Sequence, residues 1–251
     1  MNWDDIDLII FDVDGTLYDQ RRLRARMLAA LMRQTIRSGS LHTIRVLRTF
    51  RQYREALGEE AGDDFVNRQY ALTATQCGCS VENVRNLVSE WIEQRPLRHF
   101  HGYRYPGVQP LFEALAASNR TIAIFSDYPA AAKLDALGLK PHLVVSANDE
   151  DVGRLKPDPA GLYKILRLTG MDAGRSLMVG DRFDRDWEAA RRVGMRAIIR
   201  SRRPGVRADT FFSYTDPLFQ PILRAARGLE GNRTQPGLHV PESPSIATGH
   251  G

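Results

Sequence analysis

The most informative stretch of the sequence is residues 8–16, Leu8-Ile9-Ile10-Phe11-Asp12-Val13-Asp14-Gly15-Thr16. Its apolar run, residues 8–11, is typical of a parallel strand buried on both faces, and Asp-Val-Asp-Gly ends that strand in a turn. Residues two positions apart on an extended chain point to the same side, so the carboxylates of Asp12 and Asp14 can face one site. The stretch therefore predicts a buried strand that carries two acids at its carboxyl end.

Further apolar runs predict strands over 121–125, 143–145, 176–179 and 197–199, and helical patterns separate them at 109–118, 130–138, 158–169 and 184–193. This alternation predicts an α/β fold with a doubly wound parallel sheet and right-handed crossovers. Ser126 and Asp181 follow strands just as Asp12 does, and ligands bind at this edge of such sheets. These residues could simply begin turns and cap helices. Because a polar side chain follows each of three strands at the same edge of the sheet, we favour a binding site there.

Residues 19–100 interrupt the alternation with amphipathic helical patterns, one of which places Ile44, Leu47 and Phe50 on a single face. We expect a discontinuous core formed by residues 1–18 and 101–228, with an all-helical cap inserted at 19–100. From residue 229 to 251 the chain is rich in Gly, Pro, Ser and Thr without periodicity, which predicts a disordered tail.

Bulk composition favours a globular protein, with 251 residues of which 43% are hydrophobic and 26% charged. No run reaches the ~18 apolar residues that a membrane helix needs, and the acidic start lacks the pattern of a secretory signal. Cys77 and Cys79 lie too close together to form a disulfide framework. We expect free thiols and a cytoplasmic location.

Positive charge is concentrated in the predicted cap, where residues 20–54 hold ten arginines and no acidic residue. Arg45, Arg48 and Arg51 form a stripe beside the apolar face of one predicted helix. We favour a solvated helix face for this stripe; the alternative is that some arginines face the core and attract anionic substrates. No nucleic-acid-binding motif accompanies the isoelectric point of about 9.4, so a nucleic-acid partner is not predicted.

The chemistry that these residues suit best is phosphoryl transfer, which needs a nucleophile, charge neutralisation and a proton donor. Asp12 and Asp14 supply two of these parts, and a divalent cation removes the repulsion between neighbouring carboxylates. The chain contains only four lysines. Lys156, directly before Pro157-Asp158-Pro159, is therefore a candidate for a compact positive charge in the site.

With these motifs the chain resembles the haloacid dehalogenase-like hydrolases, in the phosphatase branch with a helical cap after the first motif, which includes phosphoglycolate phosphatase and β-phosphoglucomutase types. The resemblance covers about residues 6–200 and rests on four motifs in order: Phe11-Asp12-Val13-Asp14-Gly15-Thr16-Leu17; Ser126; Lys156-Pro157-Asp158-Pro159; and Gly180-Asp181-Arg182-Phe183-Asp184-Arg185-Asp186 with Ala190 and Gly194-Met195. The first string is very specific, whereas the single Ser126 is weak alone.

The resemblance implies a role for each site residue. Asp12 forms an aspartyl-phosphate, while Asp14 donates a proton to the leaving group and then activates water. Mg²⁺ is held by the carboxylates of Asp12 and Asp181 and by the backbone carbonyl of Asp14. Ser126 and Lys156 hold the phosphoryl oxygens, and Lys156 also tempers the charge of Asp12. Asp186 supports the metal site. The expected substrate is a small phosphorylated metabolite whose identity the sequence does not reveal, and neither does it reveal the oligomeric state.

Three alternatives remain open to test. A dehalogenase on this fold needs the nucleophilic carboxylate but neither a metal nor a second acid, so Asp14 and Asp181 argue against it. A phosphomutase uses the same core and differs in how the cap returns a bisphosphate to the active site. A non-catalytic, basic interaction module could retain the fold, but intact Asp12, Asp14, Lys156 and Asp181 argue against that interpretation.

Overall fold

The computed structural model describes residues 1–57, 64–205, 207 and 209–233, with side chains as far as residue 226. Its centre is a parallel six-stranded sheet in the order β3-β2-β1-β4-β5-β6. The strands are β1 Leu8–Phe11, β2 Thr121–Ser126, β3 Leu143–Ser146, β4 Ser176–Gly180, β5 Arg196–Arg200 and β6 Thr210–Phe211. Residues 8–11 of the stretch 8–16 thus form an inner strand of the sheet, and each of these four residues is fully buried.

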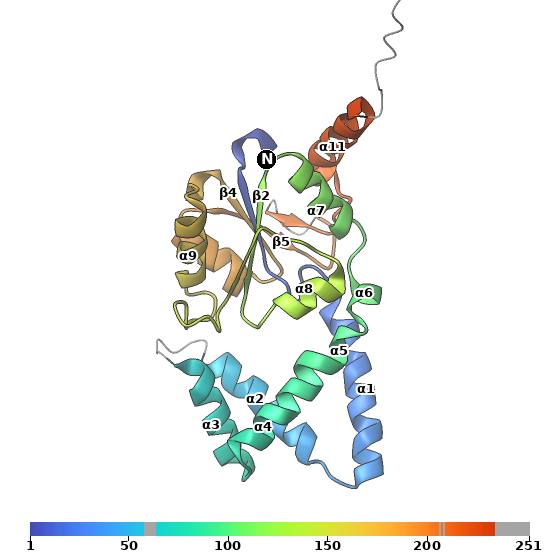
Figure 1. Cartoon of the computed structure of the whole chain (residues 1–251), viewed down its shortest axis with the longest axis vertical. Coiled ribbons are helices and arrows are strands. Elements are labelled where there is room, and N and C mark those ends of the chain that lie inside the picture. Colours follow the sequence, from blue (N-terminus) through green and yellow to red (C-terminus); the bar gives the residue numbers. More distant parts are fainter. Residues whose placement is uncertain (58–63, 206, 208, 234–251) are drawn as a thin grey trace, which may run out of the picture.

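Helices cover both faces of the sheet (Figure 1), as an alternation of side chains along each strand requires. Ile9 and Phe11 of β1 belong to one core cluster together with residues of α7 (Val108–Ala117), α8 (Ala131–Leu137) and α11 (Gln220–Arg233). Leu8 and Ile10 belong to a second cluster with residues of α9 (Ala160–Thr169) and α10 (Glu188–Arg192). The predicted doubly wound α/β fold is confirmed.

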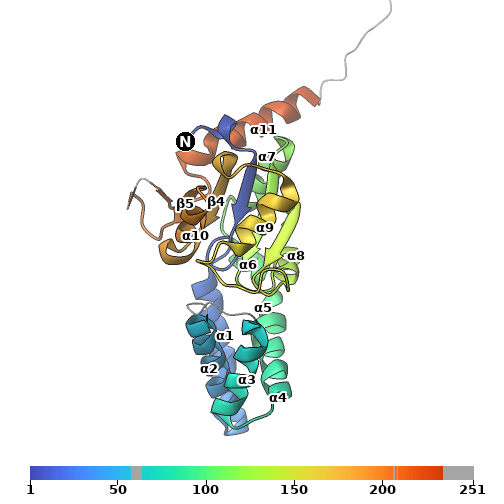
Figure 2. The same ribbon diagram turned by 90° about the vertical axis from the view of Figure 1, so that its left-hand side faces the viewer.

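A separate group of helices lies beyond the sheet (Figures 1 and 2). It comprises α1 Gln20–Ser38, α2 His42–Leu57, α3 Phe65–Cys77, α4 Val81–Val88, the π-helical turn η2 Ser89–Gln94 and α5 Arg95–Leu97. Leu47, Phe50, Val84 and Trp91 are buried among them. The predicted inserted helical cap is thus present, and its bounds at residues 19 and 100 stay a prediction.

The chain crosses twice between sheet and cap, and the two crossings are hydrogen-bonded to each other. The backbone N–H of Asp19 donates to the carbonyl of Tyr103 at 2.8 Å, and that of Tyr105 donates to the carbonyl of Leu17 at 3.1 Å. The short helix α6 (Phe100–Tyr103) follows the cap, and its Phe100 ring lies 4.6 Å from the ring of Tyr18, centroid to centroid. Backbone hydrogen bonds therefore hold the two segments that connect core and cap side by side.

Arg54 of α2 is buried where the cap meets the core, with only 4% of its surface exposed. Its guanidinium donates to Gln69 Oε1 at 3.0 Å, to Asn148 Oδ1 at 2.7 Å and to the backbone carbonyl of Asp127. One arginine of the basic stretch therefore joins α2 to the loops that follow β2 and β3. Arg45, Arg48 and Arg51 of the stripe are exposed residues, but Arg45 donates to the backbone carbonyl of Cys77, and burial lowers the pKa of the Arg51 guanidinium. The solvated helix face therefore stays a prediction.

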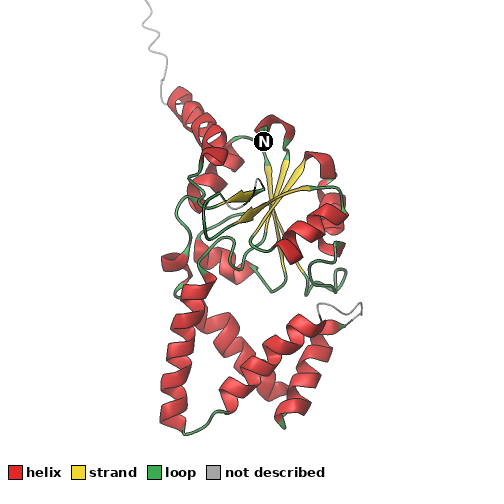
Figure 3. Cartoon of the chain, turned by 180° about the vertical axis from the view of Figure 1, so that it is seen from behind, coloured by secondary structure: helices red, strands yellow, loops and turns green. Residues whose placement is uncertain are grey.

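The structure differs from the sequence pattern at two places (Figure 3). Strand β6 has only two residues, too few to show periodicity. Helix α11 continues to Arg233, so residues 229–233 of the predicted tail are helical, and residues 234–251 lie outside the described residues.

Cys77 and Cys79 are free, as expected. In the described part of the chain, no helix is long and apolar enough to span a bilayer.

Candidate active site

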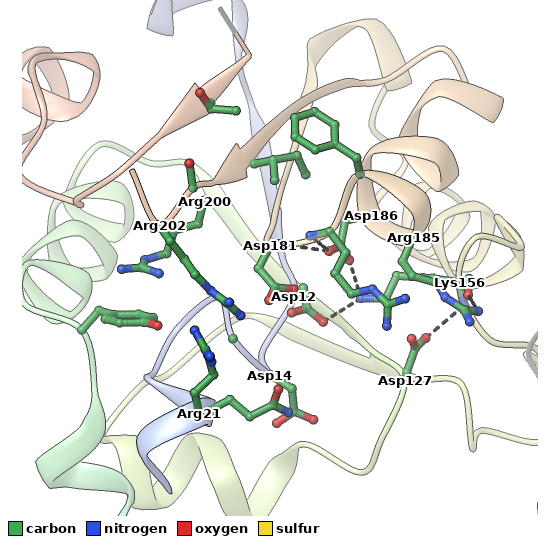
Figure 4. A pocket seen from close by; sticks show the side chains of 18 of the residues that line it. Asp12, Asp14, Arg21, Asp127, Lys156, Asp181, Arg185, Asp186, Arg200 and Arg202 are labelled. Atoms are coloured by element: carbon green, nitrogen blue, oxygen red, sulfur yellow. Dashed lines mark hydrogen bonds and ion pairs between the residues drawn. The ribbon is translucent and has the colours of Figure 1, made fainter. Parts of the chain in front are cut away.

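The carboxyl ends of β1, β2 and β4 meet at a cavity of about 660 Å³ that lies between the sheet and the cap. Asp12, Asp127 and Asp181 line it from the sheet, and Arg24 and Glu55 line it from α1 and α2. Figure 4 shows Asp12 near the centre, with Asp181 and Asp186 above it and Asp14 below. Parallel strands bring their carboxyl ends to one edge, which explains why residues so distant in sequence share this cavity.

Both oxygens of the Asp12 carboxylate have a partner. Lys156 Nζ donates to Oδ1 at 2.6 Å, and the hydroxyl of Thr16 donates to Oδ2 at 2.8 Å. Burial raises the pKa of Asp12 well above its ordinary value; Lys156 opposes this shift, while the nearby charges of Asp186 and Asp181 add to it. Lys156 is thus the cation that favours the ionised form of Asp12.

All donors of the Lys156 ammonium are used inside the protein. Besides Asp12, Nζ donates to Asp186 Oδ1 at 2.7 Å and to the backbone carbonyl of Phe125 at 3.2 Å, which completes its three N–H bonds. Burial lowers the pKa of Lys156, but Asp12 and Asp186 outweigh it and hold the pKa well above its ordinary value. In this structure Lys156 is thus a permanent cation that bonds two carboxylates, and its predicted contact with a phosphoryl oxygen would require one bond to be exchanged.

Asp186 fixes the turn that presents Asp181. Its Oδ2 accepts the backbone N–H groups of Asp181 and Arg182, each at 3.0 Å. Two glycines leave room for this arrangement. A Cβ on Gly180 would lie 2.3 Å from the Cβ of Asp186, and one on Gly15, whose φ is +95°, would lie 2.2 Å from Asp181 Oδ2. The loops after β1 and β4 therefore touch, and both contacts need glycine.

The donor set of Asp12, Asp181 and Asp186 fits a divalent cation. One carboxylate oxygen from each residue lies within 4.8 Å of the others. Burial, with the charge of Asp186 adding to it, raises the pKa of Asp181 to about 7. Hard carboxylate oxygens are the ligands that Mg²⁺ prefers, and a cation relieves the repulsion that raises this pKa. The side chain of Asp14 is not part of this cluster, and its role as a ligand through the backbone carbonyl stays a prediction.

Mg²⁺ is expected to raise the melting temperature more at about pH 8 than at about pH 5.5. The pKa of Asp181 is raised from about 3.9 in the unfolded chain to about 7 in the folded one. The metal-free folded state therefore binds the extra proton between these values, and that contribution to stability is lost as pH rises through about 7. Mg²⁺ competes with this proton, so its benefit grows with pH. Thermal unfolding with and without Mg²⁺ measures the effect; Asp181→Asn should remove most of it, and equal shifts at both pH values would contradict the assignment.

Asp14 is held by two residues that the sequence analysis does not identify. Lys133 Nζ of α8 donates to both carboxylate oxygens, at 2.8 and 2.7 Å, and the hydroxyl of Tyr18 donates to Oδ1. Burial alone would raise the pKa of Asp14, but Lys133 and Tyr18 outweigh it, so the pKa lies below its ordinary value. Asp14 is thus in the form that accepts a proton from water. Donation to a leaving group requires Lys133 to loosen its hold.

Ser126 and Asp127, at the end of β2, differ in whether they line the cavity. Ser126 is buried, its Oγ accepts the backbone N–H of Tyr128 at 3.2 Å, and it is not among the described residues that line the cavity. Asp127 does line the cavity, and its Oδ1 accepts the backbone N–H of Lys156 at 3.0 Å. The phosphate-binding role of Ser126 stays a prediction, whereas Asp127 connects the second and third motifs directly.

Comparison with known proteins places these motifs in context. A family model described as haloacid dehalogenase-like hydrolase matches residues 6–194. A phosphoglycolate phosphatase of Mesorhizobium japonicum is 30% identical over 135 residues, which cover 49% of this chain and 59% of that protein, less than two thirds of its length. A phosphoglycolate phosphatase of Agrobacterium fabrum is 26% identical over 238 residues, covering 86% and 94% of the two chains. Among solved structures, a 2-haloacid dehalogenase from Pseudomonas syringae shares the fold with a TM-score of 0.59 at 25% identity, covering 88% of this chain and 98% of the other.

Proposed function

Since this chain belongs to the haloacid dehalogenase-like hydrolases, as its motifs predict, we propose that it is a Mg²⁺-dependent phosphatase that hydrolyses a small phosphomonoester through an aspartyl-phosphate on Asp12. The observation that carries the proposal is a second acid, Asp14, in the same cavity as the buried Asp12 and the cation-binding set with Asp181. A hydrolase of phosphoesters needs both acids and the metal, whereas a dehalogenase needs only the first acid.

In the first step an oxygen of Asp12 bonds to phosphorus while the bond from phosphorus to the leaving oxygen breaks, and that oxygen takes a proton from Asp14. In the second step water attacks the aspartyl-phosphate, Asp14 takes the proton from this water, and the Asp12 carboxylate is regenerated as phosphate leaves. Lys156 stabilises the carboxylate form of Asp12 before the attack and again when phosphate leaves. A divalent cation held by Asp12, Asp181 and the Asp14 carbonyl, supported by Asp186, would neutralise the phosphoryl oxygens when bound.

The names of the relatives support a phosphomonoester, and phosphoglycolate is the first compound to test. The structural likeness to a 2-haloacid dehalogenase supports the fold. The presence of Asp14 and Asp181 favours the phosphatase over a dehalogenase, because dehalogenation uses neither a proton donor for an alcohol nor a metal.

Release of inorganic phosphate tests the proposal. Purified protein with Mg²⁺ is expected to release phosphate from p-nitrophenyl phosphate and from members of a panel of phosphorylated metabolites that includes phosphoglycolate. Chelation should abolish this release and added Mg²⁺ should restore it. Three outcomes would overturn the hydrolase: halide release from 2-haloacids without metal, phosphoryl transfer between two positions of one sugar without free phosphate, or tight binding of an acidic partner with no turnover of any phosphomonoester.

A further inference from the structure

A second cavity of about 450 Å³ adjoins the active-site cavity. Its lining is Asp19, Arg21, Arg22, Ala25, Tyr105, Arg200, Arg202 and Phe212, and four of these residues, Arg21, Tyr105, Arg200 and Arg202, line the active-site cavity as well. None of the acids assigned to catalysis or to the metal lines the second cavity. It therefore offers space for the part of a substrate that is remote from the reacting phosphoryl group.

The charge of the second cavity is strongly positive. We call Arg21, Arg22, Arg200 and Arg202 the arginine wall. Asp19 is the only acid among the described lining residues, and its Oδ1 already accepts the backbone N–H of Arg22 at 3.0 Å, where it caps α1. In the part of the chain that the structure describes, no carboxylate forms an ion pair with any member of the arginine wall. A concave surface with several uncompensated guanidinium groups attracts anions.

Arg200 shows how the wall is prepared for a ligand. It is the last residue of β5, and its guanidinium carbon lies 3.4 Å from the centre of the Tyr105 ring. Its Nε is buried without a hydrogen-bond partner among the described residues. A buried N–H without a partner costs free energy. Contact with the Tyr105 ring holds the guanidinium beside the two cavities that Arg200 lines, where an anion would meet its fork of N–H donors.

The arginine wall and Lys156 lie on opposite sides of the nucleophile. In Figure 4, Arg21, Arg200 and Arg202 lie to the left of Asp12, whereas Lys156 and Asp127 lie to its right. The wall also joins the two parts of the molecule, because Arg21 and Arg22 belong to α1 of the cap, and Arg200 and Arg202 belong to the core. An anion bound there would contact both parts at once.

We infer that the arginine wall selects substrates that carry a second anionic group, a carboxylate or a phosphate, at the end remote from the phosphoryl group that reacts at Asp12. This inference rests on the proposed phosphatase function. Guanidinium groups bind both kinds of anion through paired hydrogen bonds. Because the second group lies away from the reacting centre, its binding energy positions the substrate, and substrates without it lose efficiency.

Matched substrate pairs test the inference and distinguish the two anions. Glycerol 3-phosphate and 3-phosphoglycerate differ by a carboxylate, and fructose 6-phosphate and fructose 1,6-bisphosphate differ by a phosphate. We expect the wild-type enzyme to prefer the anionic member of at least one pair by about tenfold or more in kcat/KM. Arg200→Gln and Arg202→Gln are expected to reduce that preference by about tenfold. Arg202 is exposed, so its variant should fold even if loss of the Arg200 stack is harmful.

Arg33→Gln is the matched control, since Arg33 is exposed on α1 and lines neither cavity, and it should keep the wild-type preference. Equal kcat/KM for both members of both pairs, or an unchanged preference in Arg202→Gln, would overturn the inference. Turnover of p-nitrophenyl phosphate, which has no second anionic group, distinguishes failure of the arginine wall from failure of the proposed phosphatase function. If it is hydrolysed and no preference appears, only the arginine wall is wrong; if no phosphomonoester is hydrolysed, the proposed function fails.

Discussion

Asp12→Asn is expected to lower turnover by about four orders of magnitude or more, because a neutral amide cannot attack phosphorus and the covalent route has no substitute. The fold should survive this change. The substitution removes a buried acid whose pKa is raised by burial and by the charges of Asp186 and Asp181, and Lys156 keeps its second carboxylate, Asp186. We therefore expect a folded, inactive protein, checked by steady-state phosphate release together with thermal unfolding.

Asp7→Asn is the control for this variant. Asp7 directly precedes β1, at the opposite edge of the sheet from Asp12, and pairs with Arg175 at the surface. Exposed ion pairs contribute little to stability, and no cavity-lining residue is changed, so wild-type turnover is expected. Turnover of Asp12→Asn close to that of the wild type would mean that another residue is the nucleophile.

Lys156→Met should both stop turnover and strongly destabilise the metal-free protein. Removal of the ammonium leaves the carboxylates of Asp12 and Asp186 buried without their cation. Breaking a buried ion pair on one side lowers the free energy of unfolding by about 3–5 kcal/mol. The loss should shrink towards about pH 5, because the raised pKa of Asp12 lets a proton replace the missing charge. Denaturant unfolding in the presence of a chelator, at about pH 7 and about pH 5, measures both effects.

Lys164→Met provides the comparison for Lys156→Met. Lys164 also bonds two acids, Asp149 and Asp151, but their side chains are 32% and 53% exposed. Exposed pairs of this kind contribute little to stability, so the loss in Lys164→Met should be small. If Lys156→Met proved as stable as Lys164→Met without metal, the central cation role assigned to Lys156 would be wrong.

Strands β1 to β5 could be predicted because each of them has an apolar run of its own in the sequence. The run at 8–11 matches β1 residue for residue, and the runs near residues 121, 143, 176 and 197 fall within one residue of the observed strands at each end. Buried parallel strands need continuous apolar sequence, and this need is visible without a structure. Strand β6 carries no such signal, since its pairing with β5 depends on the path of the loop before it.

The site was predictable where motifs lie at strand ends, and less so where a helix or a long loop supplies the residue. Lys133 reaches Asp14 from 119 positions away, on a helix without a motif. The scarcity of lysine, which pointed to Lys156, applied to Lys133 equally and could have identified it. Arg200 also ends a predicted strand, so the same strand-end argument that selected Asp181 could have identified this arginine as well.

Chemical trapping of the phosphorylated enzyme shows whether Asp12 carries the aspartyl-phosphate. Wild-type protein is incubated with Mg²⁺ and a phosphomonoester that it hydrolyses, quenched, reduced with borohydride and digested for mass spectrometry. An aspartyl-phosphate is reduced to homoserine, so homoserine is expected at position 12. It should form only when substrate is present, and it should be absent from Asp12→Asn. Reduction at another residue, or full phosphate release with no modified residue under quenching at steady state, would contradict this assignment.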